Sequence, residues 1–140
     1  MSARLSDPAA RHRVLIVDDE ESTRLLIART LSQDLQVDAM LAGTCEQALR
    51  LAGNYAYDAI LLDVLMPGIG GIGVLAEIRA SSPNAATPVI MVSVVSDSAT
   101  VERCLAAGAN AYHVKPVRRG ELVETVRTQF ASRQKPRILS

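Results

Sequence analysis

Five short apolar runs alternate along the chain with segments that carry the spacing of amphipathic helices, and this alternation restricts the fold more than any other feature. The runs lie at residues 14–18, 36–41, 57–63, 88–94 and 111–114. Strands that alternate with helices are joined by crossover connections, and such strands form a parallel sheet. Because the first, third and fourth runs are almost continuously apolar, helices are expected to cover both faces of that sheet. The prediction is an α/β fold with a doubly wound, five-stranded parallel sheet and five helices in three layers.

Smaller sequence signals agree with this arrangement. The run at 36–41 alternates more than the others and carries Asp38, as an edge strand would. Thr44 followed by Gln47 fits a capping box at the start of the second helix, and Gly108 suits the left-handed residue that ends the fourth. The first helix should present one apolar face to the core, formed by Leu26, Ile27 and Leu31.

The length of 140 residues supports one domain, which we place at residues 13–132. Residues 1–12 are expected to form an N-terminal tail, and residues 133–140 a basic C-terminal tail or the start of a linker. Both a stand-alone domain and the N-terminal part of a longer protein fit this organisation. Cys45 and Cys104 lie in separate apolar segments without metal-ligand spacing, so we expect two buried thiols.

Charge and hydropathy argue against several classes of function. Basic and acidic side chains number 15 each, so the chain lacks the basic excess of a dedicated nucleic-acid binder, and we expect no direct nucleic-acid binding. Aromatic residues make up only 3% of the chain, which argues against a base-stacking surface. No apolar run approaches the roughly 20 residues that span a bilayer, and the N-terminus lacks a signal-peptide stretch. We therefore expect a cytoplasmic protein without membrane contact.

Acidic residues cluster where two of the predicted strands end. Asp18, Asp19 and Glu20 come at the end of the first strand, and Asp63 ends the third. Ligands of doubly wound sheets bind beyond the carboxyl ends of the strands, and with strand order 2-1-3-4-5 these residues would share one rim. A single acid after a strand is more often a helix N-cap, but three acids on adjacent strand ends repel one another unless a positive charge lies among them.

Two positive partners suit this acidic cluster. A hard divalent cation takes oxygen ligands, and Mg²⁺ is typical of sites with few carboxylates and several waters. Lys115 follows the fifth strand, precedes Pro116, and is the only lysine outside the C-terminal tail. Placed opposite the acids, its ammonium would add a mobile positive charge. Ser93, at the end of the fourth strand, would lie on the same rim.

The ordered set of strand-end residues resembles the receiver domain of two-component response regulators over roughly residues 12–132. The resemblance rests on acids, a loop motif, a hydroxyl, an aromatic residue and a lysine: Asp18 and Asp19, Asp63 with Met66, Pro67 and Gly71, Ser93, and Tyr112 with Lys115 and Pro116. Separations of 44 residues from Asp19 to Asp63, 30 from Asp63 to Ser93 and 22 from Ser93 to Lys115 are similar to those of the family. The resemblance implies a flavodoxin-like sheet with strand order 2-1-3-4-5.

The resemblance also implies a function, the acceptance of a phosphoryl group from a sensor histidine kinase or a histidine phosphotransfer protein in a Mg²⁺-dependent reaction. Asp63 would be the phosphoryl acceptor, Lys115 would pair with the phosphoryl group, and Ser93 would donate a hydrogen bond to it. The ligands of Mg²⁺ would be Asp18, Asp19, Asp63 and the backbone carbonyl of Leu65. The chain would not be an enzyme in the usual sense, because it would catalyse only transfer to its own Asp63 and slow dephosphorylation. A carboxylate nucleophile beside Mg²⁺ and Lys115 fits the charge neutralisation that phosphoryl transfer requires.

Three departures from the family pattern bear on rate and leave the reacting groups in place. Val94 follows Ser93 where the family prefers a small side chain, and Leu65 and Val95 are apolar where many members carry polar residues. Gly70 replaces an acid or amide often found before the loop glycine. The side chains of Val94, Leu65 and Val95 cannot orient a hydrolytic water by hydrogen bonding. We therefore expect slow self-dephosphorylation.

The signal is expected to pass from Asp63 to a protein surface. Ser93 would move toward the phosphoryl group, and Tyr112, the aromatic switch that the resemblance implies, would turn into the space this leaves. That movement would reshape the surface of the fourth helix, the fifth strand and the fifth helix through a population shift. We expect a downstream protein partner or a second copy of the chain to bind this surface, which includes Thr100, Arg103, Arg118 and Arg119.

Two other classes of function compete with this interpretation. Gly68, Gly70 and Gly73 match the G-x-G-x-x-G pattern of a dinucleotide-binding loop, but such a loop should turn directly from the strand, and residues 63–67 intervene. A carboxylate at Asp63 would also repel the pyrophosphate. The other alternative is a receiver-like interaction module that never takes phosphate. Against it stands the complete set of reacting residues, Asp19, Asp63, Ser93 and Lys115.

Overall fold

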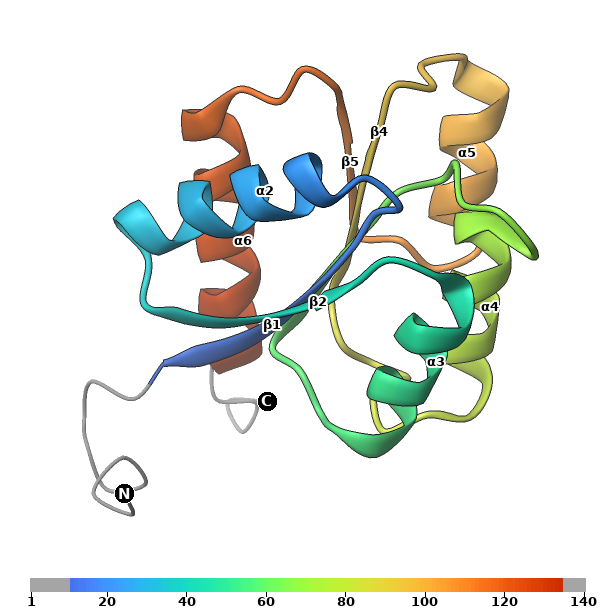
Figure 1. Cartoon of the computed structure of the whole chain (residues 1–140), viewed down its shortest axis with the longest axis horizontal. Helices are drawn as coiled ribbons and strands as arrows, with labels where there is room; N and C mark the ends of the chain where they lie inside the picture. Colours follow the sequence, from blue (N-terminus) through green and yellow to red (C-terminus); the bar gives the residue numbers. More distant parts are fainter. Residues whose placement is uncertain (1–10, 135–140) are drawn as a thin grey trace, which may run out of the picture.

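The computed structural model describes residues 11–134, over which five strands and five helices alternate, labelled as in Figure 1. The strands are β1 (His12–Val17), β2 (Val37–Ala42), β3 (Ala59–Leu62), β4 (Val89–Ser93) and β5 (Ala111–Val114). The helices are α2 (Glu21–Asp34), α3 (Cys45–Asn54), α4 (Gly70–Ser81), α5 (Ser98–Ala106) and α6 (Arg119–Gln134). All strand pairs are parallel and the order is β2-β1-β3-β4-β5, which confirms the predicted fold.

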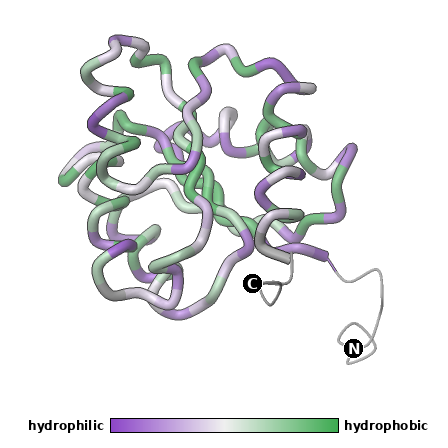
Figure 2. The backbone as a smooth tube through the Cα atoms, turned by 180° about the vertical axis from the view of Figure 1, so that it is seen from behind, coloured by the Kyte–Doolittle hydropathy of each residue, from purple (hydrophilic) through white to green (hydrophobic). Residues whose placement is uncertain are grey.

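Helices cover both faces of the sheet, with α2 and α6 on one face and α3, α4 and α5 on the other (Figure 1). Successive side chains of a strand point to opposite faces, so β1 contributes Leu15 and Val17 to one core and Val14 and Ile16 to the other. The hydrophobic strands occupy the centre of the molecule in Figure 2. Burial on both faces explains why the central strands are apolar at nearly every position.

The residues predicted to cap the helices have the expected conformations. Thr44 Oγ1 accepts the N–H of Gln47 at 3.1 Å, while Gln47 Oε1 reaches back to the N–H of Gly43 at 2.9 Å, one residue earlier than in the standard box. Gly108, just after α5, has a φ of 110°. Cys45 and Cys104 are free and buried, as predicted. None of the helices over residues 11–134 combines the length and the apolar character needed to cross a membrane.

Some boundaries and one helix face differ from the prediction. β1 begins at His12, before the apolar run, because the ladder with β2 starts there, and α6 continues to Gln134. Leu26 is 54% exposed, whereas Ile27 and Leu31 are buried. Leu26 lies to one side of the narrow stripe by which α2 contacts the sheet, so its expected place in the core was wrong. The remainder of the two predicted tails, residues 1–10 and 135–140, lies outside the described residues.

Candidate functional site

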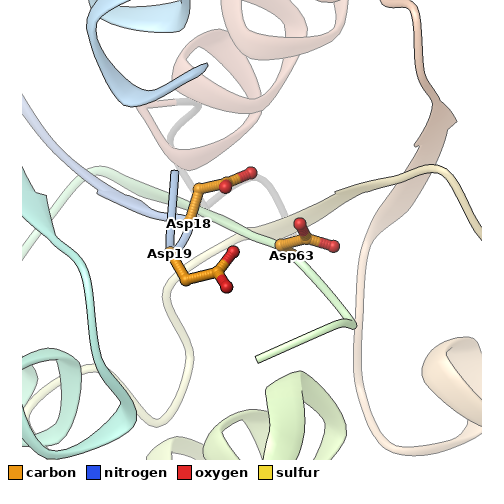
Figure 3. Close-up of side chains that lie close together, drawn as sticks. All are labelled: Asp18, Asp19 and Asp63. Carbon is orange, nitrogen blue, oxygen red and sulfur yellow. The ribbon is translucent and has the colours of Figure 1, made fainter. Parts of the chain in front are cut away.

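Three carboxylates meet at the carboxyl ends of β1 and β3, which are neighbours in the sheet. The ladder continues into both loops, since the N–H of Asp18 bonds to the carbonyl of Ala42 and the N–H of Asp63 to the carbonyl of Val17. Carboxylate oxygens of Asp18, Asp19 and Asp63 lie within 4.8 Å of one another (Figure 3). Asp18 is 2% exposed and Asp63 5% exposed, while Asp19 opens to solvent. The structure therefore brings the three predicted acids together.

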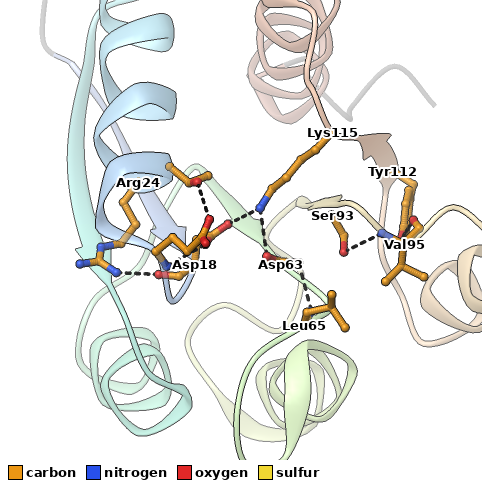
Figure 4. A network of polar contacts seen from close by, with 10 residues as sticks. Asp18, Arg24, Asp63, Leu65, Ser93, Val95, Tyr112 and Lys115 are labelled. Carbon is orange, nitrogen blue, oxygen red and sulfur yellow. Dashed lines mark hydrogen bonds and ion pairs between the residues drawn. The ribbon is translucent and has the colours of Figure 1, made fainter.

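Lys115 supplies the positive charge at this cluster (Figure 4). Its ammonium lies 2.7 Å from Asp18 Oδ2 and 3.1 Å from Asp63 Oδ2. The backbone N–H of Lys115 bonds to the carbonyl of Ser93 at 2.9 Å, which fixes the point where the side chain leaves β5. Burial alone would lower the pKa of Lys115, but the two carboxylates outweigh that effect and raise it. Lys115 is therefore held as a cation between the two buried acids.

Each oxygen of the two buried carboxylates has a partner. Asp18 Oδ1 accepts the N–H of Glu20 at 2.9 Å, and Asp63 Oδ1 accepts the N–H of Leu65 at 3.0 Å. Burial raises the pKa of Asp18, and the bonds from Lys115 and Glu20 oppose that rise. These contacts fix the direction of both side chains. Fixed carboxylates at short mutual distance, together with one open carboxylate, form an oxygen-donor set that fits a hard divalent cation.

Ser93 and Tyr112 both contact the backbone of Val95, in the loop after β4 (Figure 4). Ser93 is fully buried, and its Oγ accepts the N–H of Val95 at 3.3 Å. The hydroxyl of Tyr112 donates to the carbonyl of Val95 at 2.6 Å, and burial raises the pKa of Tyr112. Ser93 and Tyr112 thus both bond to Val95 in the loop after β4. Neither contact was foreseen from the sequence, since both depend on the path of the loop.

Apolar side chains surround the mouth of the site. Val94 is 59% exposed and Leu65 52%, and Val95 is half-buried. Ile69, in the loop between β3 and α4, is also exposed and was not predicted from the sequence. Its place between Gly68 and Gly70 was a signal that it lies in a loop. The residues expected to control access lie on the loops that leave β3 and β4, and their effect on access stays a prediction.

The glycines after β3 have roles within the loop itself. Gly68 and Gly70 have φ values of 95° and 78°, which favour glycine. A Cβ on Gly71 would lie 2.0 Å from the carbonyl oxygen of Asp63, and one on Gly73 would lie 2.9 Å from the side chain of Ile69. Turn conformation and close packing therefore account for the G-x-G-x-x-G match, and the dinucleotide alternative loses the pattern on which it rested.

One site contact was missed altogether. Arg24, at the end of the first turn of α2, donates from Nη1 to the carbonyl oxygen of Asp18 at 2.7 Å (Figure 4). The only sequence signal for it was a basic residue one helical turn beyond the acidic pair.

Comparisons with known proteins agree with the geometry. The family model described as "Response regulator receiver domain" matches residues 14–127. The chain is 34% identical over 120 residues to the DNA-binding response regulator MtrA of Mycobacterium tuberculosis, covering 86% of this chain and 51% of that protein. It is 31% identical over 130 residues to the sensory/regulatory protein RpfC of Xanthomonas campestris, covering 86% of this chain and 18% of that protein. The chain thus spans about half the length of MtrA and less than a fifth of RpfC.

Solved structures show the same likeness. The receiver domain of a sensor histidine kinase from Pseudomonas aeruginosa PAO1, with a magnesium ion coordinated in its active site cleft, matches at a TM-score of 0.79 and 31% identity, covering 87% of this chain and 99% of that one. A Francisella response regulator receiver domain matches at a TM-score of 0.81 and 27% identity, covering 89% of this chain and 100% of that one. The similarity extends over nearly all of the described residues.

Proposed function

The chain belongs to the family of response regulator receiver domains, and on that premise we propose that Asp63 is the residue that accepts the phosphoryl group. Receiver domains are signalling domains of two-component systems, and acceptance of a phosphoryl group is their family function. The observation that carries the assignment to Asp63 is its place: it is buried beside two further carboxylates and is bonded to Lys115. Asp18 is also buried and bonded to Lys115, so the choice between these two acids rests on the receiver-domain resemblance, in which the acid at the end of the third strand is the acceptor. Asp19 has no lysine bonded to it among the described residues.

The geometry supports transfer from a phosphohistidine on a sensor kinase or a phosphotransfer protein. An oxygen of Asp63 would form a new P–O bond while the P–N bond of the donor breaks, and the electron pair of that bond would leave with the imidazole ring. Lys115, already 3.1 Å from Asp63, would bond to the phosphoryl oxygens. Because the protein would do little beyond positioning and neutralising charge, the same residues would also catalyse slow hydrolysis of the product.

Mg²⁺ is the cofactor that we propose for the carboxylate cluster, because three oxygen donors within 4.8 Å suit a hard cation. The residues that would hold it are Asp18, Asp19, Asp63 and the backbone carbonyl of Leu65. A bound Mg²⁺ would offset the negative charge of the phosphoryl group. The test is isothermal titration with MgCl₂, in which Asp19→Asn should bind about tenfold more weakly than the wild type because it loses a ligand and a charge. Equal affinity would move the metal site away from this cluster.

The phosphoryl acceptor is tested by intact-mass measurement after incubation with Mg²⁺ and acetyl phosphate. The wild type should gain one phosphoryl group, and Asp63→Asn should gain none, because an amide is not a nucleophile at neutral pH. Asp58→Asn is a matched control, since Asp58 lies at the other end of β3 and its carboxylate accepts the backbone N–H of Arg13. Full phosphorylation of Asp63→Asn would overturn the assignment.

We further propose that the signal leaves through Ser93 and Tyr112. Ser93 now accepts the N–H of Val95, and if its side chain turns to donate to a phosphoryl group on Asp63 this contact would change. The loop to which Tyr112 is bonded would then move with it. The surface of α5, β5 and α6, with Thr100, Arg103, Arg118 and Arg119, would then bind a protein partner or a second copy of the chain. Amide shifts induced by beryllofluoride, a phosphoryl mimic, should reach α5 in the wild type and stop short of it in Ser93→Ala. Equal shifts in both proteins would remove Ser93 from the pathway.

Several expectations from the sequence stay predictions. These are a domain at residues 13–132, a cytoplasmic location, and the absence of direct nucleic-acid binding by this domain. The last concerns residues 13–132 only, since MtrA is a DNA-binding regulator of which the chain matches about half.

A further inference from the structure

We propose that Arg24, seated on Gly43, is a positioning residue that holds the acidic turn after β1 in the geometry needed for cation binding. The inference rests on the proposed Mg²⁺ site and concerns a residue that takes no part in it directly. It follows from three observations: the bond from Arg24 to the backbone of Asp18, the close fit of Arg24 over Gly43, and the absence, among the described residues, of a hydrogen bond or ion pair on the Asp19 carboxylate.

Arg24 fixes the peptide group between the two acids. Its Nη1 donates to the carbonyl oxygen of Asp18 at 2.7 Å, a short bond with a charged donor. The plane of that peptide sets the direction in which the backbone enters Asp19. No hydrogen bond or ion pair holds the Asp19 carboxylate among the residues that the structure describes. The position of the open carboxylate therefore depends on the backbone of the turn, and Arg24 is the side chain that anchors this backbone from α2.

Gly43 provides the space in which the guanidinium lies. A Cβ at this position would be 2.8 Å from Arg24 Nη1 and 3.3 Å from its Cζ. The φ of Gly43 is not positive, so the backbone does not require glycine there, and the requirement comes from Arg24. The backbone at Gly43 cannot easily move away from Arg24, because the N–H of Gly43 is bonded to Gln47 and the N–H of Gln47 is bonded to Thr44. Any side chain at position 43 should thus push the guanidinium off the Asp18 carbonyl.

The test is a double-mutant cycle on Mg²⁺ affinity, measured by isothermal titration, with the amide shift of Asp19 recorded in the metal-free protein. Arg24→Ala and Gly43→Ala should each weaken Mg²⁺ binding by about tenfold, as the loss of a contact that orients a ligand does. In the Arg24→Ala background, Gly43→Ala should cause no further loss. Gly53→Ala is the matched control, since apart from its chain neighbours and the backbone of its own helix no atom lies within 4 Å of the added Cβ, and it should leave both readouts unchanged.

The outcomes separate this inference from the function on which it rests. If the wild type binds Mg²⁺ and both single variants bind it equally well with an unchanged Asp19 amide shift, Arg24 is not a positioning residue. If Gly43→Ala weakens binding further in the Arg24→Ala background, Gly43 does not act through Arg24. If the wild type binds no Mg²⁺, the metal assignment fails, and the amide shift of Asp19 still decides whether Arg24 holds the turn. Urea unfolding of each variant separates a loss of positioning from a loss of fold.

Discussion

Buried polar groups close both ends of the sheet, but only the carboxyl end brings like charges together. At the amino ends of β3, β4 and β5, Asn84 is fully buried and neutral. Its amide donates to the carbonyls of Ala52 and Tyr55, and its oxygen accepts the N–H of Tyr57. Arg79 adds donors to the oxygens of four loop residues: Asn84, Ala85, Gly108 and Asn110. This network joins three loops through partners that are all present within the chain.

At the carboxyl ends of the strands, the charges do not balance. Three carboxylates share one ammonium, that of Lys115, so the cluster of these four groups has a formal charge of −2 (three negative, one positive). Such repulsion costs stability, which a cation would relieve. The comparison teaches that a single sheet can keep a hydrogen-bonded network around one cation, Arg79, at one end and mutually repelling like charges at the other. The first end holds the loops together, and the second end is prepared for ligands.

The largest effect is expected from Lys115→Met, which removes the only positive side chain that bonds to the two buried carboxylates among the described residues. Phosphorylation by acetyl phosphate should fall by on the order of a hundredfold. The free energy of unfolding should fall by about 3 kcal/mol, because two buried carboxylates lose their partner. Part of this loss should be recovered in about 10 mM MgCl₂, because a cation that binds only the folded state stabilises it. Urea unfolding with and without Mg²⁺ measures it, and an unchanged stability would mean that the acids are balanced by other groups.

The pKa of Lys115 sets the pH range in which Lys115→Met should have a lower free energy of unfolding than the wild type. The carboxylates raise that pKa above its value in the unfolded chain. The ion pair therefore contributes fully below about pH 10.4 and is lost only as the pH rises through the folded-state pKa. The stability difference between the wild type and Lys115→Met should be constant between about pH 7 and 9. A difference that vanished within this range would contradict the raised pKa.

Asn84→Ala tests the other end and should have the next largest effect. It leaves the N–H of Tyr57 and the carbonyls of Ala52 and Tyr55 without partners in a buried place, so the free energy of unfolding should fall by about 2 kcal/mol. Mg²⁺ should restore none of this, and the rate of phosphorylation of the folded protein should stay within about twofold of the wild type. A Mg²⁺ affinity that changed with Asn84 would show that the two ends are coupled.

The smallest effect is expected at two side chains in the loop after β4, exposed Val94 and half-buried Val95. Val94→Ala should open the path of the hydrolytic water, and Val95→Glu should add a group that can orient it, so each should speed loss of the phosphoryl group by about three- to fivefold. Because Val94 is 59% exposed, the free energy of unfolding should change by less than about 0.5 kcal/mol. Phosphoprotein half-lives measure the rates. If neither substitution alters the half-life, these side chains do not control access.

The sequence predicted features that depend on burial and on strand ends. Strands buried on both faces, such as β3 and β4, must be apolar at nearly every position, so their number and direction were readable. Asp18 and Asp63 could be placed together because parallel strands end at one edge. Leu26 could not be placed correctly, since the width of the buried stripe of α2 depends on how closely α2 and α6 approach the sheet.

The contacts that adjust the site depend on loop paths, which no periodic pattern records. The two bonds to Val95 arise because the chain after β4 turns back over Ser93 toward Tyr112. Arg24 was invisible for a similar reason: its partner is a backbone carbonyl, and a backbone carbonyl carries no residue identity. Its fit over Gly43 joins two loops that are separate in the sequence.

The loop glycines differ in how much mutation they can tolerate. Gly71 has no room for a single carbon atom, because a Cβ there would overlap the backbone carbonyl of Asp63 itself. Gly68 has open space around it and needs only a left-handed backbone, which asparagine and aspartate can also adopt. In a library of all single substitutions selected for folded protein, position 71 should therefore remain glycine alone, while position 68 admits asparagine and aspartate. A lineage that drifted freely along this loop would keep Gly71 even after it had lost Asp63.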